Sequence, residues 1–486
     1  MSPAEKTNNG AETAALLSTT EFPRHPSEMN DIQGRNGDMY SSIYHLGNFE
    51  LFRISLLIVA VALGLVSGSL YGFGRYASAL RASFDASQPQ VQSLGIWMDI
   101  GNYLGHPITG WIYDRLGPSF SCIAAAVILC ISYSTIHHCV KYEYATKNSG
   151  FRMWWLLIAA FVGVGIGSGL GYIAGLGTVT KQFSGAWAVG WVAAGYGLSS
   201  TLVAWTYQLF GLSHMFAVWA LLVGVVNIVG ALAFRGTAQQ QDDGCEPSNA
   251  SFHPEQETVN TSSQMELDRV AEGDRRQDVG SSHWATWQKH DFWFLFLSFA
   301  SVTGCGLFVI NNVSSFVQSR GLSDSFAGSL VIFLSACNVS GRVLVGMLVK
   351  EEQNLEYLRG AALLMTIGLS ASALLDATAS LVCTVGCVAT AYGASWVLLV
   401  GVLKEWYGKE HFGKDYGVIA MGPAVSGLIF NSLSAAFYQQ RIEGDTSVCT
   451  GAYCFRRAFA VTASAALLGC LALSLLISTR RSSATI

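Results

Sequence analysis

The stretch Gly95–Pro118, GIWMDIGNYLGHPITGWIYDRLGP, decides the fold. It begins as an apolar segment long enough to cross a bilayer and ends in a charged turn, Asp114–Pro118. Within the apolar part lie Asp99, Asn102 and His106, whose spacings of three and four residues place them near one face of a helix. Because a carboxylate at membrane depth is costly unless it faces a cavity or a partner, we expect one face of this helix to meet lipid and another to be wetter.

The composition is typical of a helical membrane protein that crosses the bilayer many times. Of the 486 residues, 51% are hydrophobic and 12% are charged, and the mean hydropathy is +0.38. Soluble domains carry about 25% charged residues. The net charge is −4, and no basic tract suggests nucleic acid as a partner. The eleven cysteines lie mostly inside apolar runs without a zinc-type spacing, so no metal and no other cofactor is expected.

Apolar runs of roughly 20 residues, the length that spans a bilayer as a helix, occur twelve times. They lie near 53–76, 91–112, 118–139, 153–178, 186–209, 213–234, 292–316, 325–349, 358–378, 380–403, 417–438 and 455–478. A polar stretch separates six runs from six, which predicts an all-α membrane protein built of two six-helix bundles. The predicted parts are a disordered cytosolic tail 1–50, a bundle 51–234, a flexible cytosolic linker 235–290, a bundle 291–478 and a cytosolic tail 479–486.

Lysine and arginine are more frequent in the loops on the side of the N-terminus, which predicts that both termini and the linker are cytosolic. In this orientation Cys449 and Cys454 lie in the outer loop before the last helix. Residues five apart in a turn can reach disulfide distance, and the compartment would be oxidising. We expect a disulfide, with two free thiols as the alternative.

The N-terminal tail contains one sorting pattern. Glu12, Leu16 and Leu17 match an acidic dileucine signal, which would be recognised by a sorting adaptor. A chance match of this short pattern is the alternative.

Several motifs resemble those of a known family. The segment Gly110–Pro118 resembles the loop motif G-x-x-x-D-R-x-G of the major facilitator superfamily. Residues Tyr71–Arg75, Gly341–Val343, His411–Gly417 and Cys449–Arg456 resemble the nodulin-like branch related to monocarboxylate permeases, which includes fungal transporters of the Mch1 type. The resemblance covers 53–478. It implies a secondary transporter that moves a small polar or anionic solute by alternating access, with or without a coupled proton.

The same resemblance implies a role for the turn after the second helix. Gly110, Asp114, Arg115 and Gly117 would lock the inner face by pairing with the other bundle. The alternative is a plain hairpin turn, in which Gly117 and Pro118 stop one helix and start the next.

Two arginines are candidates for binding an anionic solute. Arg75 corresponds to a cationic residue of monocarboxylate permeases, although it can also reach lipid headgroups. In helix eight those permeases carry an Asp four residues before an Arg. Here Arg342 is retained and Asn338 takes the Asp position, and Asn cannot take up and release a proton. Arg342 is therefore either a solute contact or a structural residue near the cytosolic end of its helix.

A proton carrier is expected in helix two instead. Asp99 is the first candidate, because burial lets a carboxyl group hold a proton near neutral pH. His106 is the second, since imidazole titrates near neutrality; the pair His106-Pro107 also fits a kink with a hydrogen-bonded side chain. Asn102 shares their helix face.

Other polar or aromatic groups at membrane depth are candidate solute contacts. Helices seven and ten line the cavity in the family fold, so the resemblance implies Asn311, Tyr392 and Trp396. Packing is the alternative for each.

The sequence does not favour an enzyme. It contains no HExxH, no Ser-His-Asp set and no GxxxxGK[ST] phosphate loop. A non-transporting membrane receptor on the same fold remains the alternative to a transporter. The tail signal and the fungal resemblance favour a vacuolar or endosomal membrane over the plasma membrane, and the expected partners are a small solute and lipid.

Overall fold

The computed structural model of the protein describes residues 51–86, 88–146, 151–235, 289–408, 412–441 and 449–484. The predicted sorting signal at Glu12, Leu16 and Leu17 and nearly all of the predicted linker lie outside these residues. The chain forms two compact units, Met1–Ser55 and Leu56–Ile486, and every contact discussed below lies within the second. In the described residues every regular element is a helix.

The first candidate membrane span is Leu51–Ala77, and the second unit begins inside it, at Leu56. The elements of the first half are the 3-10 helix η1 (Gly68–Gly72), α3 (Phe73–Ser83), α4 (Gln88–Asp99), the π-helix η2 (Ile100–Leu104), α5 (His106–Thr146), α6 (Phe151–Gln182) and α7 (Ala186–Ala233). The second half contains α11 (His290–Ser319), α12 (Asp324–Leu348), η3 (Glu351–Gln353), α13 (Asn354–Leu374), α14 (Thr378–Tyr407), α15 (Phe412–Ala420), α16 (Gly422–Gln439) and α17 (Tyr453–Ala484). The last helix thus runs through most of the predicted C-terminal tail.

Two glycines divide the longest helical segments. Ten helices in the described residues are long and apolar enough to cross a membrane. Two of these, the segments Ser93–Tyr142 and Ala186–Ala233, contain Gly117 at φ 80° and Gly211 at φ 66°. A left-handed φ stops an α-helix, and glycine adopts it without steric cost, so each segment is a hairpin of two spans. The described residues therefore hold the twelve predicted spans, and the predicted fold class is confirmed.

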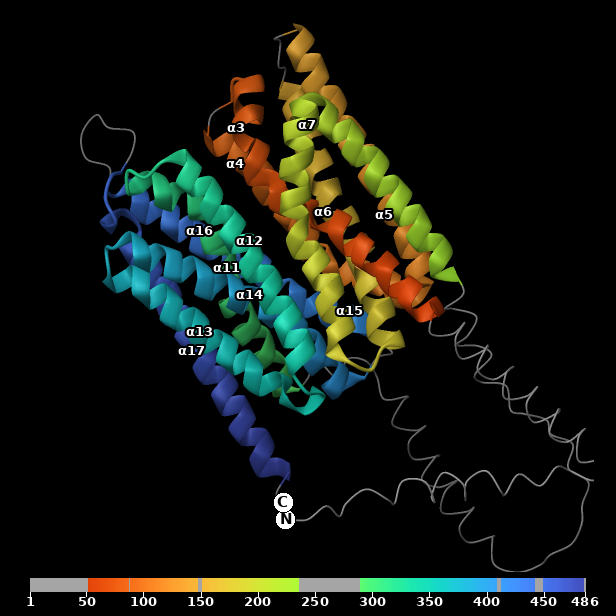
Figure 1. Cartoon of the computed structure of the whole chain (residues 1–486), viewed down its shortest axis with the longest axis vertical. Helices are drawn as coiled ribbons and strands as arrows, with labels where there is room; N and C mark the ends of the chain where they lie inside the picture. The colour runs from red at the N-terminus through yellow and green to blue at the C-terminus, as the bar shows by residue number, and fades with distance from the viewer. Residues whose placement is uncertain are drawn as a thin grey trace, which may run out of the picture. The chain divides into compact units, whose positions relative to one another are not determined.

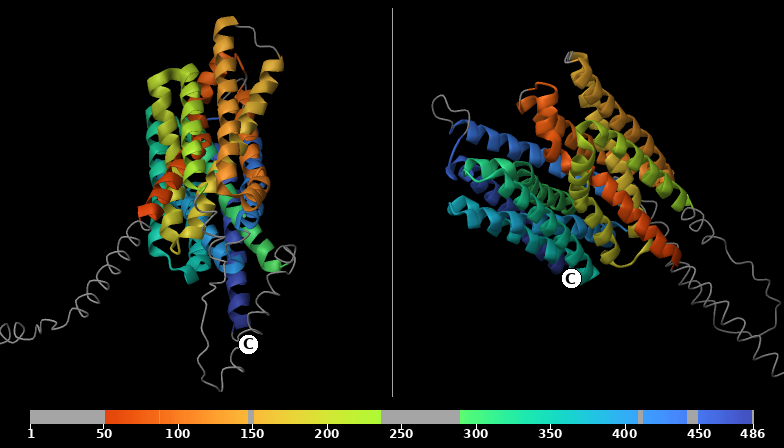
Figure 2. Two further views of the ribbon diagram at one scale, coloured as in Figure 1. Left: turned by 90° about the vertical axis from the view of Figure 1, so that its right-hand side faces the viewer. Right: turned by 45° about the horizontal axis from the view of Figure 1, so that its top comes forward.

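The spans form two bundles that meet along a shared face (Figure 1; Figure 2). In the first half α5 packs on α6 and α7, and in the second half α14 packs on α12 and α13 while α17 packs on α11 and α13. The halves meet where α5 contacts α15 and where α7 contacts α12. The outer surface is apolar: Leu221, Ile332 and Leu374 are 71%, 71% and 76% exposed, as expected of side chains that face lipid.

Small residues allow close helix crossings in the first half. A Cβ on Gly101 would lie 2.3 Å from the carbonyl oxygen of Val162, and a Cβ on Gly165 would lie 2.2 Å from that of Met98. The backbones of η2 and α6 therefore touch directly, which is how helices gain packing energy in lipid.

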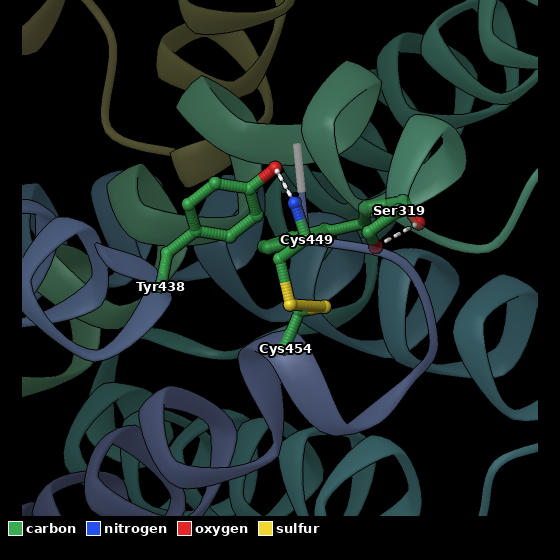
Figure 3. The surroundings of a disulfide bond; sticks show 5 residues. Ser319, Tyr438, Cys449 and Cys454 are labelled. Carbon is green, nitrogen blue, oxygen red and sulfur yellow. Dashed lines mark hydrogen bonds between the residues drawn. A yellow bond between two sulfur atoms is a disulfide. The ribbon is translucent and has the colours of Figure 1, made fainter. Parts of the chain in front are cut away.

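A disulfide joins Cys449 to Cys454 at the start of α17, with a Cα–Cα distance of 6.0 Å (Figure 3). Two hydrogen bonds tie this loop to neighbouring helices. The backbone N–H of Cys449 donates to the hydroxyl of Tyr438 in α16 at 3.0 Å, and the N–H of Gly451 donates to the carbonyl of Ser319 in α11 at 2.6 Å. The ends of three helices are thus joined at one corner.

Candidate functional site

A cavity lies between the two halves of the protein. Apart from Asn102 and Arg342, every side chain that lines it is an aromatic ring. The lining residues are Tyr71, Asn102, Tyr103, His106, Tyr172, Tyr196, Arg342, Trp396 and Tyr416. Both halves contribute, so a solute bound here would contact the two bundles at once.

Three tyrosine hydroxyls meet at the boundary between the halves. The hydroxyl of Tyr392 in α14 lies 2.9 Å from that of Tyr71 and 3.3 Å from that of Tyr103. Tyr71 and Tyr103 are 3.5 Å apart. Tyr71 is half-buried, whereas Tyr103 and Tyr392 are buried. This set of three residues, called the tyrosine triangle below, joins two residues of the first half to one of the second.

Irregular helix geometry positions the two tyrosines of the first half. Tyr71 lies in the 3-10 helix η1, where a Cβ on Gly68 would lie 2.2 Å from the carbonyl oxygen of Tyr196. The close approach to α7 sets the ring of Tyr71 edge-on against Tyr196, with centroids 5.1 Å apart. Tyr103 lies in the π-helix η2, which ends at Leu104, shortly before Pro107; proline lacks the N–H that a continuous helix requires.

Arg342 is the only permanently charged side chain that lines the cavity, and it is 1% exposed. Its Nε donates to Oδ1 of Asn338 at 2.8 Å, and its Nη1 donates to the carbonyl of Ala193 in the other half at 2.7 Å. The guanidinium lies 6.0 Å from the ring centroid of Tyr196. Among the described residues no carboxylate pairs with it. A buried charge without a counter-charge is costly, so the two hydrogen bonds compensate Arg342 only in part.

His106 and Asn102 lie one helical turn apart in the wall of the cavity. Nδ1 of His106 is hydrogen-bonded to the carbonyl of Asn102, and its ring stacks on Tyr103 with centroids 6.1 Å apart. Nδ2 of Asn102 donates to the hydroxyl of Tyr196 at 3.4 Å. The side chain of His106, which directly precedes Pro107, is therefore hydrogen-bonded to the preceding turn.

The structure brings two further predicted residues to the site. Tyr392 belongs to the tyrosine triangle, and Trp396, one turn further along α14, lines the cavity. The ring of Trp396 lies 6.2 Å from that of Tyr103, and its buried Nε1 has no hydrogen-bond partner among the described residues. A solute acceptor would satisfy this N–H group.

Five predicted residues do not line the cavity: Asn338 and Tyr392, whose contacts are given above, and Arg75, Asn311 and Asp99. Arg75 is exposed and lies 5.7 Å from the ring centroid of Tyr207. Asn311 is also exposed, and its neighbour Asn312 bonds to Asn431 instead, at 2.7 Å. Asp99 is half-buried one turn before Tyr103, and no hydrogen bond joins it to another described residue.

The motif at the end of the second span contacts the other half directly. Oδ1 of Asp114 accepts from the backbone N–H of Gly413 at 3.1 Å, and Oδ2 accepts from that of Lys414 at 2.8 Å. A carboxylate is favourable here because Gly413 and Lys414 begin α15, where helix N–H groups lack partners. A Cβ on Gly110 would lie 2.0 Å from the carbonyl oxygen of Gly413, so the two backbones touch.

Other contacts close the same end of the protein, called the closed end below. Lys404 of α14 donates to the carbonyl of Ser184, and a Cβ on Gly190 would lie 2.9 Å from the carbonyl oxygen of Arg342. Arg115 does not join the other half: it is exposed and lies 5.9 Å from the ring centroid of Trp111. In Figure 1 the ribbons of the two halves meet near α15 and diverge towards the opposite end, which carries α3 and α4.

The sequence interpretation missed most of the tyrosines. Five tyrosines that line the cavity are not among the candidates from the sequence: Tyr71, Tyr103, Tyr172, Tyr196 and Tyr416. A usable signal existed: Tyr172 lies in the sequence GLGYIAG and Tyr196 in AAGYG, where small neighbours make room for a large ring. Small residues lie next to these large tyrosine rings because the helices that carry them pack closely together.

Comparisons with known proteins point in one direction. The family model for "Major Facilitator Superfamily" matches residues 54–400. "Uncharacterized MFS-type transporter YhjX" of Escherichia coli is 24% identical, over 77% of this chain and 86% of that protein. "Probable transporter mch1" of Emericella nidulans is 23% identical, over 84% of this chain and 82% of that protein.

A solved structure shares the fold. The proton:xylose symporter XylE, bound to 6-bromo-6-deoxy-D-glucose, superposes with a TM-score of 0.64. The match covers 87% of this chain and 95% of the symporter at 15% sequence identity. At this identity the likeness concerns the arrangement of the helices alone.

Proposed function

Because this chain belongs to the Major Facilitator Superfamily and is a membrane transporter, we propose that it carries a small organic anion across the membrane by alternating access. The bound anion occupies the cavity between the halves. Arg342 holds its negative group, and the aromatic walls contact the rest of it.

The burial of Arg342 carries this proposal. A guanidinium has five N–H donors, and two of those on Arg342 bond to Asn338 and Ala193. Donors therefore remain for a carboxylate, which a guanidinium binds through a two-pronged fork. A neutral sugar would leave the charge of Arg342 without compensation, so we expect the xylose carried by the similar symporter not to be a substrate here.

Contacts between the halves at one end of the described residues support alternating access. Asp114, Gly110 and Lys404 hold the closed end together. Beyond the tyrosine triangle, the hydroxyl groups of Ser200 and Ser335 are hydrogen-bonded between the halves at 3.2 Å. We propose that the closed end faces the cytosol, as the distribution of lysine and arginine predicts, and that the structure represents the state closed towards the cytosol.

Transport of radiolabelled solutes into proteoliposomes tests this function. The panel consists of four anions, acetate, lactate, benzoate and fumarate, and two neutral solutes, xylose and glycerol. We expect saturable uptake of at least one anion and no saturable uptake of the neutral solutes, since only an anion compensates Arg342.

The same assay separates a transporter from a receptor on the same fold. A receptor would bind an anion from the panel in solution without concentrating it in the vesicles. Saturable uptake of xylose with no uptake of any anion would refute the proposed substrate class.

We further propose a vacuolar or endosomal membrane as the location, with a sorting adaptor bound to the tail. A fluorescent fusion with Leu16 and Leu17 changed to alanine is expected to move from the internal membrane to the plasma membrane. The matched control changes Leu51 to alanine instead, which leaves the tail pattern intact. Plasma-membrane fluorescence both before and after the Leu16/Leu17 change would contradict the sorting role.

A further inference from the structure

We propose that the closed end carries a second binding site, which takes a small amphiphilic amine from the cytosol and holds this end shut. The site is a cavity of about 210 Å³ between the two halves, called the closed-end cavity below. The proposal rests on the alternating access of the proposed function, but it does not depend on which solute is carried.

The closed-end cavity lies along the same helices as the aromatic cavity, further towards the closed end. On α6, Tyr172 lines the aromatic cavity and Thr180 lines the closed-end cavity. On α7, Tyr196 lines the first and Val189 the second. Each pair is separated by about two helical turns, which is roughly 11 Å along a helix. No described residue lines both cavities, so the two can hold different ligands.

Buried apolar side chains from both halves form the walls of the closed-end cavity. Phe183 and Val189 belong to the first half, and Val397 and Val400 belong to α14 of the second. All four side chains are buried. The cavity is smaller than the roughly 300–1,000 Å³ of pockets that hold drug-sized ligands. The ligand is therefore a small molecule with an apolar body, of the size of one aromatic ring with a short chain.

The mouth of this cavity favours a cationic head group. Glu352 in η3 and Glu405 near the end of α14 line the cavity and are exposed, so they mark the side from which a ligand enters. Lys404 also lines it, and its ammonium group donates to the carbonyl of Ser184 across the halves. Among the described lining residues the two carboxylates outnumber the single ammonium group, which favours an amine over a carboxylate on the ligand.

A ligand in this cavity stabilises the closed end because it touches both halves at once. When this end opens, the wall that carries Phe183 separates from the wall that carries Val397, and the ligand loses contact with one of them. The amine therefore has a higher affinity for the closed state, and its binding favours that state. A cytosolic amine thus slows the release of the carried solute without occupying the aromatic cavity.

Equilibrium binding of 2-phenylethylamine to the purified full-length protein tests the site and its preference for an amine. This amine is protonated at pH 7, and 2-phenylethanol is the matched neutral probe with the same ring and chain. We expect the amine to bind up to about fivefold more tightly than the alcohol, the largest factor that an exposed ion pair contributes. In Glu352→Gln the affinity for the amine should fall towards that for the alcohol. Asp376→Asn is the control, since it removes an exposed carboxylate just before α14 begins, at the opposite end of that helix.

A second set of variants fills the cavity. Val400→Trp is the main variant, because an indole ring there occupies the space that the probes require. We expect both probes to bind at least about tenfold more weakly to it than to wild type. Val189→Phe serves as a second variant if Val400→Trp does not fold as a monodisperse protein. Val425→Trp is the matched control, since Val425 is 52% exposed on the outer surface of α16, and it should keep the wild-type affinities.

Spin labels on the exposed residues Leu116 and Tyr357, one on each half, test the effect on the closed end. They are placed in Asp114→Asn, which loses a charged acceptor of two backbone N–H groups and so weakens the closed end. Double electron–electron resonance measures the distances between the labels. We expect saturating 2-phenylethylamine to increase the share of short distances, and Val400→Trp to remove this increase.

The other results contradict the proposal at different steps. Absence of binding of either probe to wild type, or binding that persists in both cavity-filling variants, overturns the site. Equal affinities for amine and alcohol that Glu352→Gln leaves unchanged overturn the ligand class. A share of short distances that falls or stays constant at saturating amine overturns the effect on the closed end. A failure of the proposed function would appear separately, as absence of anion uptake, because none of these measurements includes a carried solute.

Discussion

Replacing Arg342 with glutamine is expected to weaken binding of the transported anion about a hundredfold, because two charge-assisted hydrogen bonds are lost from a buried site. Arg342 is 1% exposed and has no carboxylate partner among the described residues. In the variant, water therefore cannot replace the lost hydrogen bonds of the guanidinium at a low cost in free energy. The probe is whichever of acetate, lactate, benzoate and fumarate raises the melting temperature of the wild-type protein. The measurement is equilibrium binding of this anion to the purified protein, followed by uptake into proteoliposomes.

Arg75→Gln is the matched control for this experiment. It removes the same charge from the first half, but Arg75 is exposed beside Tyr207 and does not line the cavity. We expect its affinity to stay within twofold of wild type. If Arg342→Gln kept its affinity while Arg75→Gln lost it, the anion would bind near the outer end of the first span and the proposed site would be wrong.

Replacing Gly110 with alanine is expected to force the closed end apart. The new Cβ would lie 2.0 Å from the carbonyl oxygen of Gly413, and a backbone atom cannot move aside as a flexible side chain can. Overpacking of this kind costs about 1–3 kcal/mol, which is roughly a tenfold to hundredfold change in the equilibrium between the two access states. The state closed at this end should become the minor one, and uptake should fall accordingly.

Spin labels on Leu116 and Tyr357 measure this change directly. These exposed positions lie on the two halves beside the closed end. The distance between the labels, measured by double electron–electron resonance, should lengthen in Gly110→Ala. Gly360→Ala is the control, since nothing lies within 4 Å of its Cβ position. An unchanged distance in Gly110→Ala would show that this glycine contact does not hold the end closed.

The membrane spans could be predicted from the sequence because each span must bury about 20 residues in lipid, whatever its partners are. Even the turns at Gly117 and Gly211 follow local rules. The resemblance of the motifs to Mch1-type transporters is confirmed by the family match and by the fungal relatives. The spans depend on the transfer of apolar residues from water into lipid, and the turns depend on backbone geometry within a few residues.

The cavity could be predicted only in part, because its members come from six or more helices whose rotation no local pattern fixes. His106, Arg342 and Trp396 were candidates and line it. Asp99 was placed on the face of His106 by assuming a regular α-helix. The π-helix at Ile100–Leu104 alters that rotation, and the sequence signalled it only through Pro107.

The disulfide-containing loop before α17 restrains one end of the eleventh span, which consists of α15 and α16. Cys449–Cys454, with the bonds to Ser319 and Tyr438, fastens the outer tip of α16 to two neighbours, while Asp114 anchors the start of α15 to the opposite bundle. One residue, Met421, separates these two anchored pieces. If the proposed alternating access moves the two bundles against each other, we expect α16 to move with α11 and α17 and the chain to bend at Met421, which changes the angle between α15 and α16.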